Sequence, residues 1–262
     1  MTWGVPVILY FFLAGLAAGA ALHGVTRALG EDAASRKTGA RSLALATALI
    51  VAGAGFLILE LERPSDSWML IFHANHHSAI SWGVRILAAF GLCCFFCWSV
   101  VRAGARPNRG DRVALRLTQA LAVMLASYPG YVLFQAKAFL FWSSWLLVPL
   151  LAVGGIHAGL ALSRWLAKEE PLERRRELEF IAVTASVFMF FVMDRADYAI
   201  PRGAGSTGLI AMIGVLGIGF IAPIVLILGN GSRGLRMICI VAGCLALRAW
   251  LIFGGQTIAP AA

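Results

Sequence analysis

Charged residues are scarce in this sequence. Asp, Glu, Lys and Arg make up only 13% of its 262 residues, while 60% are hydrophobic. A soluble domain usually carries about 25% charged residues. With so few charges the chain could not coat a water-exposed surface, which excludes a soluble globular domain. Apolar runs of about 20 residues, long enough to cross ~30 Å of hydrocarbon, recur along the whole sequence.

Acidic residues are fewer than basic ones, 13 against 22, and the net charge is +9. This excess could suggest nucleic-acid binding, but the basic residues lie in short segments between apolar runs. Membrane orientation explains them better, and no nucleic-acid partner is expected. Cysteine is also sparse, and all five cysteines fall inside apolar runs. There they are expected to behave as small hydrophobic residues, so no metal site is predicted.

The apolar runs predict an all-α integral membrane protein, a single domain over residues 1–262 with eight transmembrane helices. The first run is expected to be kept, because no basic segment precedes it as in a signal peptide. An even number of spans puts both termini on one side of the membrane. The expected spans lie at about 5–28, 42–61, 80–101, 113–134, 141–163, 178–197, 208–229 and 235–256.

The distribution of basic residues predicts the orientation. Sixteen of the 22 lysines and arginines lie in or beside the connections that follow the first, third, fifth and seventh spans. Short basic connections face the cytoplasm. Both termini are therefore expected on the outer, periplasmic side of a bacterial inner membrane.

Six of the predicted spans each carry one polar residue near the outer edge. Ionisable side chains inside a membrane are costly and are a functional-site hypothesis by default. At 1.5 Å of rise per residue, all six lie within about 10 Å of that edge. They are Tyr10, Glu60, Arg85, Tyr128, Asp194 and Arg248.

Tyr128 is followed by Pro129 inside a predicted span. A proline there removes a backbone hydrogen bond, and the break is tolerated where a side chain, water or ligand satisfies the backbone. Taken alone, the pair could be a plain kink beside an interfacial tyrosine. Together with the layer of polar residues, it favours a ligand site.

A quinone has the chemistry that such a site asks for, with polar carbonyls on an apolar body. Its carbonyls need hydrogen-bond donors such as tyrosine hydroxyls or guanidinium groups, and its redox chemistry needs a proton-exchanging carboxylate. We therefore expect Tyr10, Tyr128, Arg85 and Arg248 to bind a quinone. Glu60 and Asp194 are the expected proton exchangers.

Several motifs then match a known family, end to end and in the same order. They are WGVP at 3–6, YFFLAGLAAG at 10–19, LERP at 61–64, WML at 68–70, SAISWG at 78–83, YPG at 128–130, LRAW at 247–250 and GGQ at 254–256. With these motifs the chain resembles the NrfD/PsrC family, the membrane subunits of polysulfide reductase-type enzymes. The sequence departs from the usual family pattern at FHANHH, residues 72–77.

The resemblance implies an eight-helix bundle with no tightly bound cofactor of its own. Such a subunit exchanges electrons between menaquinone or ubiquinone and a four-cluster iron–sulfur subunit, itself joined to a molybdopterin catalytic subunit. By motif position, Tyr10 and Tyr128 match quinone-contacting residues, and Glu60 falls where the family often has an acid. The outer loops at 62–80 and 194–207 are the expected docking face for the iron–sulfur partner.

Two other functions remain open at this level. His23 and His157 both lie towards the inner side, where a pair of histidines could hold a haem b, as in a cytochrome-type anchor. A small-molecule transporter would fit the length and helix count. No internal repeat stands out, however, and the polar layer lies away from the midplane, where transporters bind their substrates.

Overall fold

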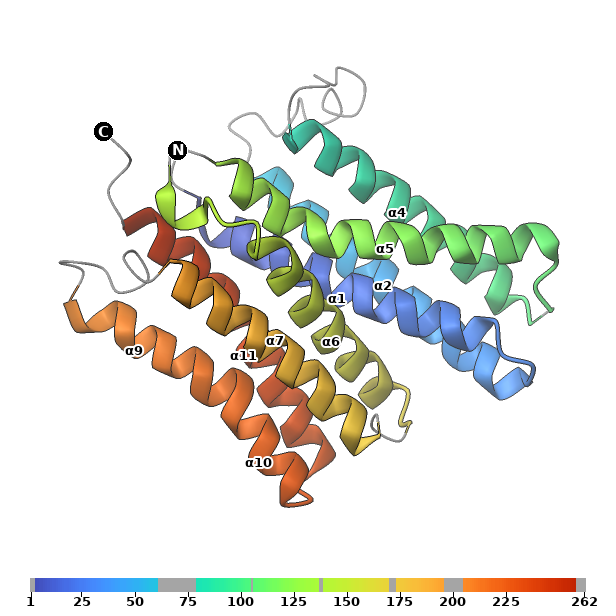
Figure 1. The fold of residues 1–262 in the computed structure, drawn as a ribbon. Coiled ribbons are helices and arrows are strands. Elements are labelled where there is room, and N and C mark those ends of the chain that lie inside the picture. Colours follow the sequence, from blue (N-terminus) through green and yellow to red (C-terminus); the bar gives the residue numbers. More distant parts are fainter. Residues whose placement is uncertain are drawn as a thin grey trace.

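The computed structural model describes residues 3–60, 79–104, 106–136, 139–169, 173–195 and 205–257, and no strand occurs among them. They form eight helical rods, of which the seventh is continuous through a π-helical turn (Figure 1). The rods are α1 Val5–Ala28, α2 Ala33–Leu59, α4 Ala79–Arg102, α5 Arg109–Gln135, α6 Leu147–Leu166, α7 Arg174–Asp194, α9 Gly205–Leu216 with η3 Gly217–Ile221 and α10 Ala222–Leu228, and α11 Arg233–Thr257. The predicted all-helical bundle is confirmed.

Seven of the described helices are long and apolar enough to cross a membrane. The remaining one, α7, was predicted as the span at 178–197. Its charged residues leave no 18-residue stretch with fewer than three charged side chains; they are Arg174, Arg175, Arg176, Glu177, Glu179 and Asp194. Length and composition therefore support seven of the eight predicted spans.

Two helix starts differ from the prediction. Helix α2 begins at Ala33 rather than near 42, because the carboxylate of Asp32 caps it by accepting a hydrogen bond from the Ser35 N–H at 2.9 Å. The span expected at 141–163 begins instead with a short 3-10 turn, η2 (Leu140–Trp142), and α6 follows only at Leu147. Hydropathy finds the apolar part of a helix but not its polar first turns.

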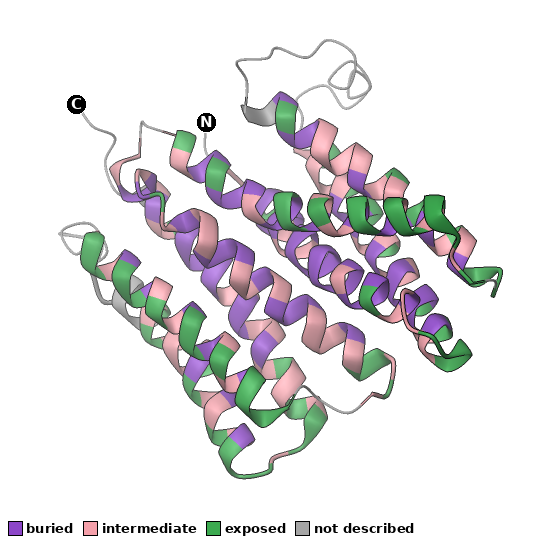
Figure 2. Cartoon of the chain, turned by 45° about the vertical axis from the view of Figure 1, so that its right-hand side comes forward, coloured by how far each residue is buried: buried purple, intermediate pink, exposed green. Residues whose placement is uncertain are grey.

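Helix α1 lies at the centre of the bundle and packs against α2, α5, α6 and α11. Its middle is a run of alanines and glycines, and Ala14, Ala17 and Ala18 are fully buried. Figure 2 shows buried residues concentrated in the middle of the bundle. Large apolar side chains such as Leu92 and Phe95 are exposed on the outside, as expected for a surface that faces lipid.

The crossing of α1 and α6 depends on glycines in both helices. Gly15 and Gly19 of α1 face Gly155 and Gly159 of α6, and a Cβ at any of them would meet the opposite helix or the guanidinium of Arg248. Small residues four apart let helix backbones approach closely in a membrane. The small-residue pair in α1 is therefore a packing surface.

The bundle has two chemically different ends. The start of α1 and the end of α11 lie together at one end (Figure 1), where the Trp3 N–H donates to Oε1 of Gln256 at 2.8 Å and Nε2 of Gln256 donates to the Trp3 carbonyl at 3.0 Å. We call this the terminal end. The opposite end, where α6 and α10 end and α7 and α11 begin, is the basic end. The predicted docking loops, 62–80 and 194–207, fall almost entirely outside the described residues.

Candidate functional site at the terminal end

Tyr10 lies near the start of α1 with its side chain turned into the bundle. Only 2% of the residue is exposed. Its ring faces α2 at Gly53, where a Cβ would stand 3.6 Å from Cδ2 of Tyr10. Among the described residues its hydroxyl has no hydrogen-bond partner. Buried hydroxyls are nearly always paired, so this one calls for a partner.

Tyr128 lies on α5 directly before Pro129 and is also buried. Its phenol packs on Gly83 of α4, where any Cβ would overlap the ring. Tyr10 and Tyr128 belong to one core cluster, and the helices that carry them, α1 and α5, pack against each other. The structure therefore places on neighbouring helices the two tyrosines that the sequence placed at the same depth.

Glu60 ends α2 and reaches the start of α1. Its Oε1 accepts a hydrogen bond from the Gly4 N–H at 2.9 Å. Gly4 precedes Tyr10 by six residues, which is about 9 Å along α1. Glu60 is half-buried, so its carboxylate lies between the tyrosines and the surface of the terminal end.

Arg248 of α11 is 1% exposed, and its guanidinium lies between α1 and α6. It donates hydrogen bonds of 3.1 Å to the backbone carbonyls of Phe11, Leu151 and Cys244. Nη1 also lies 2.7 Å from Sγ of Cys244. These bonds join three helices, so in this structure Arg248 serves to connect helices, and the predicted contact with a quinone stays a prediction.

Arg85 and Asp194 lie apart from the two tyrosines. Arg85 stacks over the ring of Trp82 on its own helix, with Cζ 5.4 Å from the ring centroid. Asp194 is exposed at the end of α7 and pairs with Arg195 at 3.2 Å. Helix α7 packs mainly against α6 and α10 rather than against α1 or α2. The structure thus gathers Tyr10, Tyr128 and Glu60, and leaves the other two at the periphery.

Trp142 is a buried residue of this end to which sequence reasoning gave no role. Its ring stacks on Trp3 with centroids 5.1 Å apart, and its Nε1 donates to the Leu251 carbonyl at 2.8 Å. Gly255 leaves room for the indole, since a Cβ there would overlap it. Trp145 lies only three residues away in the sequence, so no sequence signal sets Trp142 apart. Its contacts join the residues before α1 to the end of α11.

The two histidines considered for haem lie in different surroundings. Nδ1 of His23 hydrogen-bonds with Ser42 at 3.1 Å and with Ser163 at 2.9 Å, and its Nε2 lies 3.0 Å from Glu169. Both ring nitrogens are engaged, and neither is presented to a haem iron. His157 instead stacks on Phe180, with centroids 5.2 Å apart. This geometry argues against the pair as axial ligands.

Comparison with known proteins agrees with the arrangement of the whole chain. Residues 1–260 match the family described as "Polysulphide reductase, NrfD". The sequence is 25% identical to the C subunit of polysulfide reductase from Wolinella succinogenes, across 98% of this chain and 95% of that protein. It is 26% identical to protein NrfD of Escherichia coli, with the same two shares covered.

Proposed function

Because this multi-pass membrane protein belongs to the polysulphide reductase NrfD family, we propose that it is the quinone-reactive subunit of a respiratory oxidoreductase complex. It binds a quinone or quinol from the membrane pool, menaquinone or ubiquinone, as an exchangeable substrate. It passes the electrons to or from an iron–sulfur partner. The relative from Wolinella is named as one subunit of polysulfide reductase, which supports a role within a larger assembly.

The buried hydroxyl of Tyr10 is the observation that carries this proposal. It has no partner among the described residues, and Tyr10 belongs to the same buried core cluster as Tyr128. A quinone carbonyl is an acceptor that would satisfy it, while the apolar body of the quinone would contact the surrounding side chains. Pro129 interrupts the hydrogen bonding of α5 one residue from Tyr128, which leaves the backbone there open to adjustment.

Glu60 completes the chemistry of the site. Reduction of a quinone takes up two protons, and oxidation of a quinol releases two, so a group must exchange protons with water. Glu60 is half-buried and binds Gly4, about 9 Å from Tyr10 along α1, close to the end of the bundle. It is the carboxylate best placed among the described residues to exchange protons with water at the terminal end.

The proposed partners are a four-cluster iron–sulfur subunit and, through it, a molybdopterin catalytic subunit. The part of the chain that the structure describes has no group of three or more metal-ligating side chains. Electrons would therefore leave through a partner docked near the quinone site, at the terminal end. We place this end on the periplasmic side of a bacterial inner membrane, because 16 of the 22 basic residues mark the opposite end.

The test replaces single tyrosines by phenylalanine, which removes one hydroxyl and keeps the ring. Tyr10→Phe and Tyr128→Phe should each weaken quinone binding or slow turnover by roughly five- to 150-fold, the equivalent of a lost hydrogen bond of ~1–3 kcal/mol. Tyr131→Phe is the matched control, since this third tyrosine of the described chain is 42% exposed on the same α5 helix. The assay is quinol-dependent electron transfer in membranes, with assembly of the complex checked by gel filtration. Parental rates in both buried variants would place the quinone elsewhere.

A further inference from the structure

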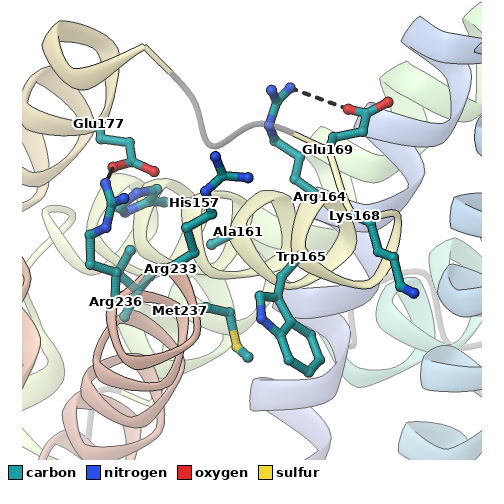
Figure 3. Close-up of a pocket in the computed structure, with 11 residues that line it drawn as sticks. His157, Ala161, Arg164, Trp165, Lys168, Glu169, Glu177, Arg233, Arg236 and Met237 are labelled. Atoms are coloured by element: carbon teal, nitrogen blue, oxygen red, sulfur yellow. Dashed lines mark hydrogen bonds and ion pairs between the residues drawn. The ribbon is translucent and has the colours of Figure 1, made fainter. Parts of the chain in front are cut away.

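A second polar pocket opens at the basic end, far from the tyrosines along the bundle axis. It lies between the end of α6 and the starts of α7 and α11, and its volume is about 220 Å³. Figure 3 shows the side chains that surround it. They are His157, Ala161, Arg164, Trp165, Lys168, Glu169, Glu177, Arg233, Arg236, Met237 and Ile240.

Positive charge is in excess in this pocket. Four of its lining side chains are cationic and only two are carboxylates. Both carboxylates are engaged: Glu177 pairs with Arg236 at 3.1 Å, and Glu169 pairs at 2.6 Å with Arg27, which lies outside the pocket, and at 3.7 Å with Arg164. The three arginines are spread across the pocket in Figure 3: Arg236 lies beside Glu177, Arg164 beside Glu169, and Arg233 between them.

His157 supplies an independent sign of a missing ligand. It is 5% exposed and lines the inner part of the pocket, and its Nε2 has no hydrogen-bond partner among the described residues. The ring is held in place by stacking on Phe180, with 7° between the planes. A buried, fixed imidazole nitrogen without a partner is costly, and it can donate to an anion that enters beside it.

The other wall of the pocket is apolar. Trp165 and Met237 lie on the side away from the two carboxylates (Figure 3), and Ala161 and Ile240 also line the cavity. Trp165 is 46% exposed at the end of α6, where tryptophans of membrane proteins contact the headgroup region of the bilayer. The pocket therefore combines a cationic wall with an apolar wall at the depth of lipid headgroups.

We propose that this pocket binds the phosphate group of an anionic phospholipid from the adjacent leaflet. The arginines and His157 would hold the phosphate oxygens, and the acyl chains would leave along Trp165 and Met237. Basic pockets between transmembrane helices on the cytoplasmic side recognise lipid phosphates in this way. A free phosphate ion shares the charge of the headgroup but would gain nothing from the apolar wall. The proposal is independent of the quinone site, because it rests on other residues at the other end.

The experiment measures lipid retention by the full-length chain, purified in detergent and exchanged into phosphatidylglycerol or phosphatidylcholine micelles. Native mass spectrometry counts the lipids that stay bound. We expect one retained phosphatidylglycerol, and about tenfold or more weaker retention in His157→Phe and in Arg233→Gln. His157→Phe preserves the ring that stacks on Phe180. Lys168→Gln changes an exposed rim residue and should weaken retention without any effect on folding.

Arg41→Gln is the matched control, because Arg41 is an exposed arginine at the same end on α2, a helix that packs mainly on α1 and α4. It should retain phosphatidylglycerol like the parent. Equal retention by the parent and all pocket variants would overturn the proposal, and so would equal retention of phosphatidylcholine. In a separate arm, inorganic phosphate at millimolar concentration is added to the delipidated protein. Binding of phosphate as tight as that of phosphatidylglycerol, lost in the same variants, would make the ligand a free anion and overturn the lipid assignment.

Discussion

Glu60 and Gly4 are 56 residues apart in sequence, and the carboxylate of Glu60 accepts the backbone N–H of Gly4 at 2.9 Å. The residue that follows α2 thus binds the residue that precedes α1. The N–H groups at a helix start have no partner within the helix, so this contact helps to satisfy them. Glu60 consequently has a structural role as well as the catalytic one proposed for it, and a variant must separate the two.

Glu60→Gln separates them, because the amide keeps an oxygen that can accept the Gly4 N–H. We expect the complex to assemble and to bind quinone normally, but turnover should fall by about tenfold or more, since the titrating group is gone. Quinol oxidation in membranes measures turnover, and quinone titration measures binding. Glu31→Gln, an exposed acid at the basic end, serves as control. Full activity in Glu60→Gln would remove this residue from proton exchange.

Gly83 offers a way to displace Tyr128 without changing it. Because a Cβ at Gly83 would overlap the phenol, Gly83→Ala should push the tyrosine from its position. We expect quinol-dependent turnover to fall by about as much as in Tyr128→Phe, roughly five- to 150-fold. Gly91→Ala is the control on the same helix, since a Cβ there would meet only Cγ2 of Ile50 at 3.7 Å. Equal rates in the two alanine variants would show that the placement of Tyr128 is unimportant.

Arg248→Met tests whether this arginine connects helices or binds a ligand. Loss of the hydrogen bonds to Phe11 and Leu151 should destabilise the protein by about 2–4 kcal/mol, seen as a lower unfolding temperature in detergent. Arg112→Met, at an exposed position of α5, should leave that temperature unchanged. If Arg248→Met unfolds at the parental temperature yet no longer binds quinone, its predicted role as a ligand residue is the correct one.

Low pH should weaken the hydrogen bonds and ion pairs that Glu169, just beyond the end of α6, makes with its neighbours. Burial alone would raise the pKa of this carboxyl, but hydrogen bonds from Arg27 and His23 outweigh it and hold the pKa below its ordinary 4.5. A carboxylate with a lowered pKa stabilises the fold above its unfolded pKa, and this stabilisation is lost as pH falls through the folded value. The parent should therefore lose stability progressively once the pH drops below about 4.5.

Glu169→Gln gives the corresponding measurement. At neutral pH the variant should unfold at a temperature about 2–4 °C below that of the parent. This difference in unfolding temperature should vanish as the pH falls below the pKa of Glu169. Glu173→Gln is the control, because the side chain of Glu173 is 72% exposed. This variant should unfold at the same temperature as the parent at every pH. If the unfolding temperatures of the parent and Glu169→Gln differ by the same amount at every pH, Glu169 acts through packing rather than through its charge.

Sequence reasoning could assign each polar residue a depth along its helix, but it could not predict which helices lie side by side. Depth follows from a rise of 1.5 Å per residue, which is the same in every helix. That rule put Tyr10 and Tyr128 in one layer, and the structure places them in one core cluster. The same rule put Asp194 in the layer, yet α7 packs at the side of the bundle away from α2. Which helices become neighbours is decided by glycine contacts such as Gly19 with Gly159.

The direction of the Arg248 side chain also could not be predicted from the sequence. A charged residue in an apolar span suggests either a ligand contact or a buried bond to protein. Its partners are backbone carbonyls, which every residue has, so no sequence pattern marks them. Likewise, nothing before Trp142 signals a 3-10 turn. That segment is held by stacking on Trp3 and by the bond to Leu251, both more than 100 residues away in sequence.

The position of Arg248 has a consequence for how the protein is made. Ribosomes deliver the N-terminal segments first, so α1 and α6 reach the bilayer well before α11. A guanidinium without hydrogen-bond partners is unfavourable in hydrocarbon. In this protein the backbone carbonyls of Phe11 and Leu151 accept hydrogen bonds from the guanidinium of Arg248. The last helix can therefore settle only against a bundle that has already gathered its first and fifth spans. The hydrogen bonds of Arg248 are therefore complete only in an assembled bundle, where α1, α6 and α11 lie together.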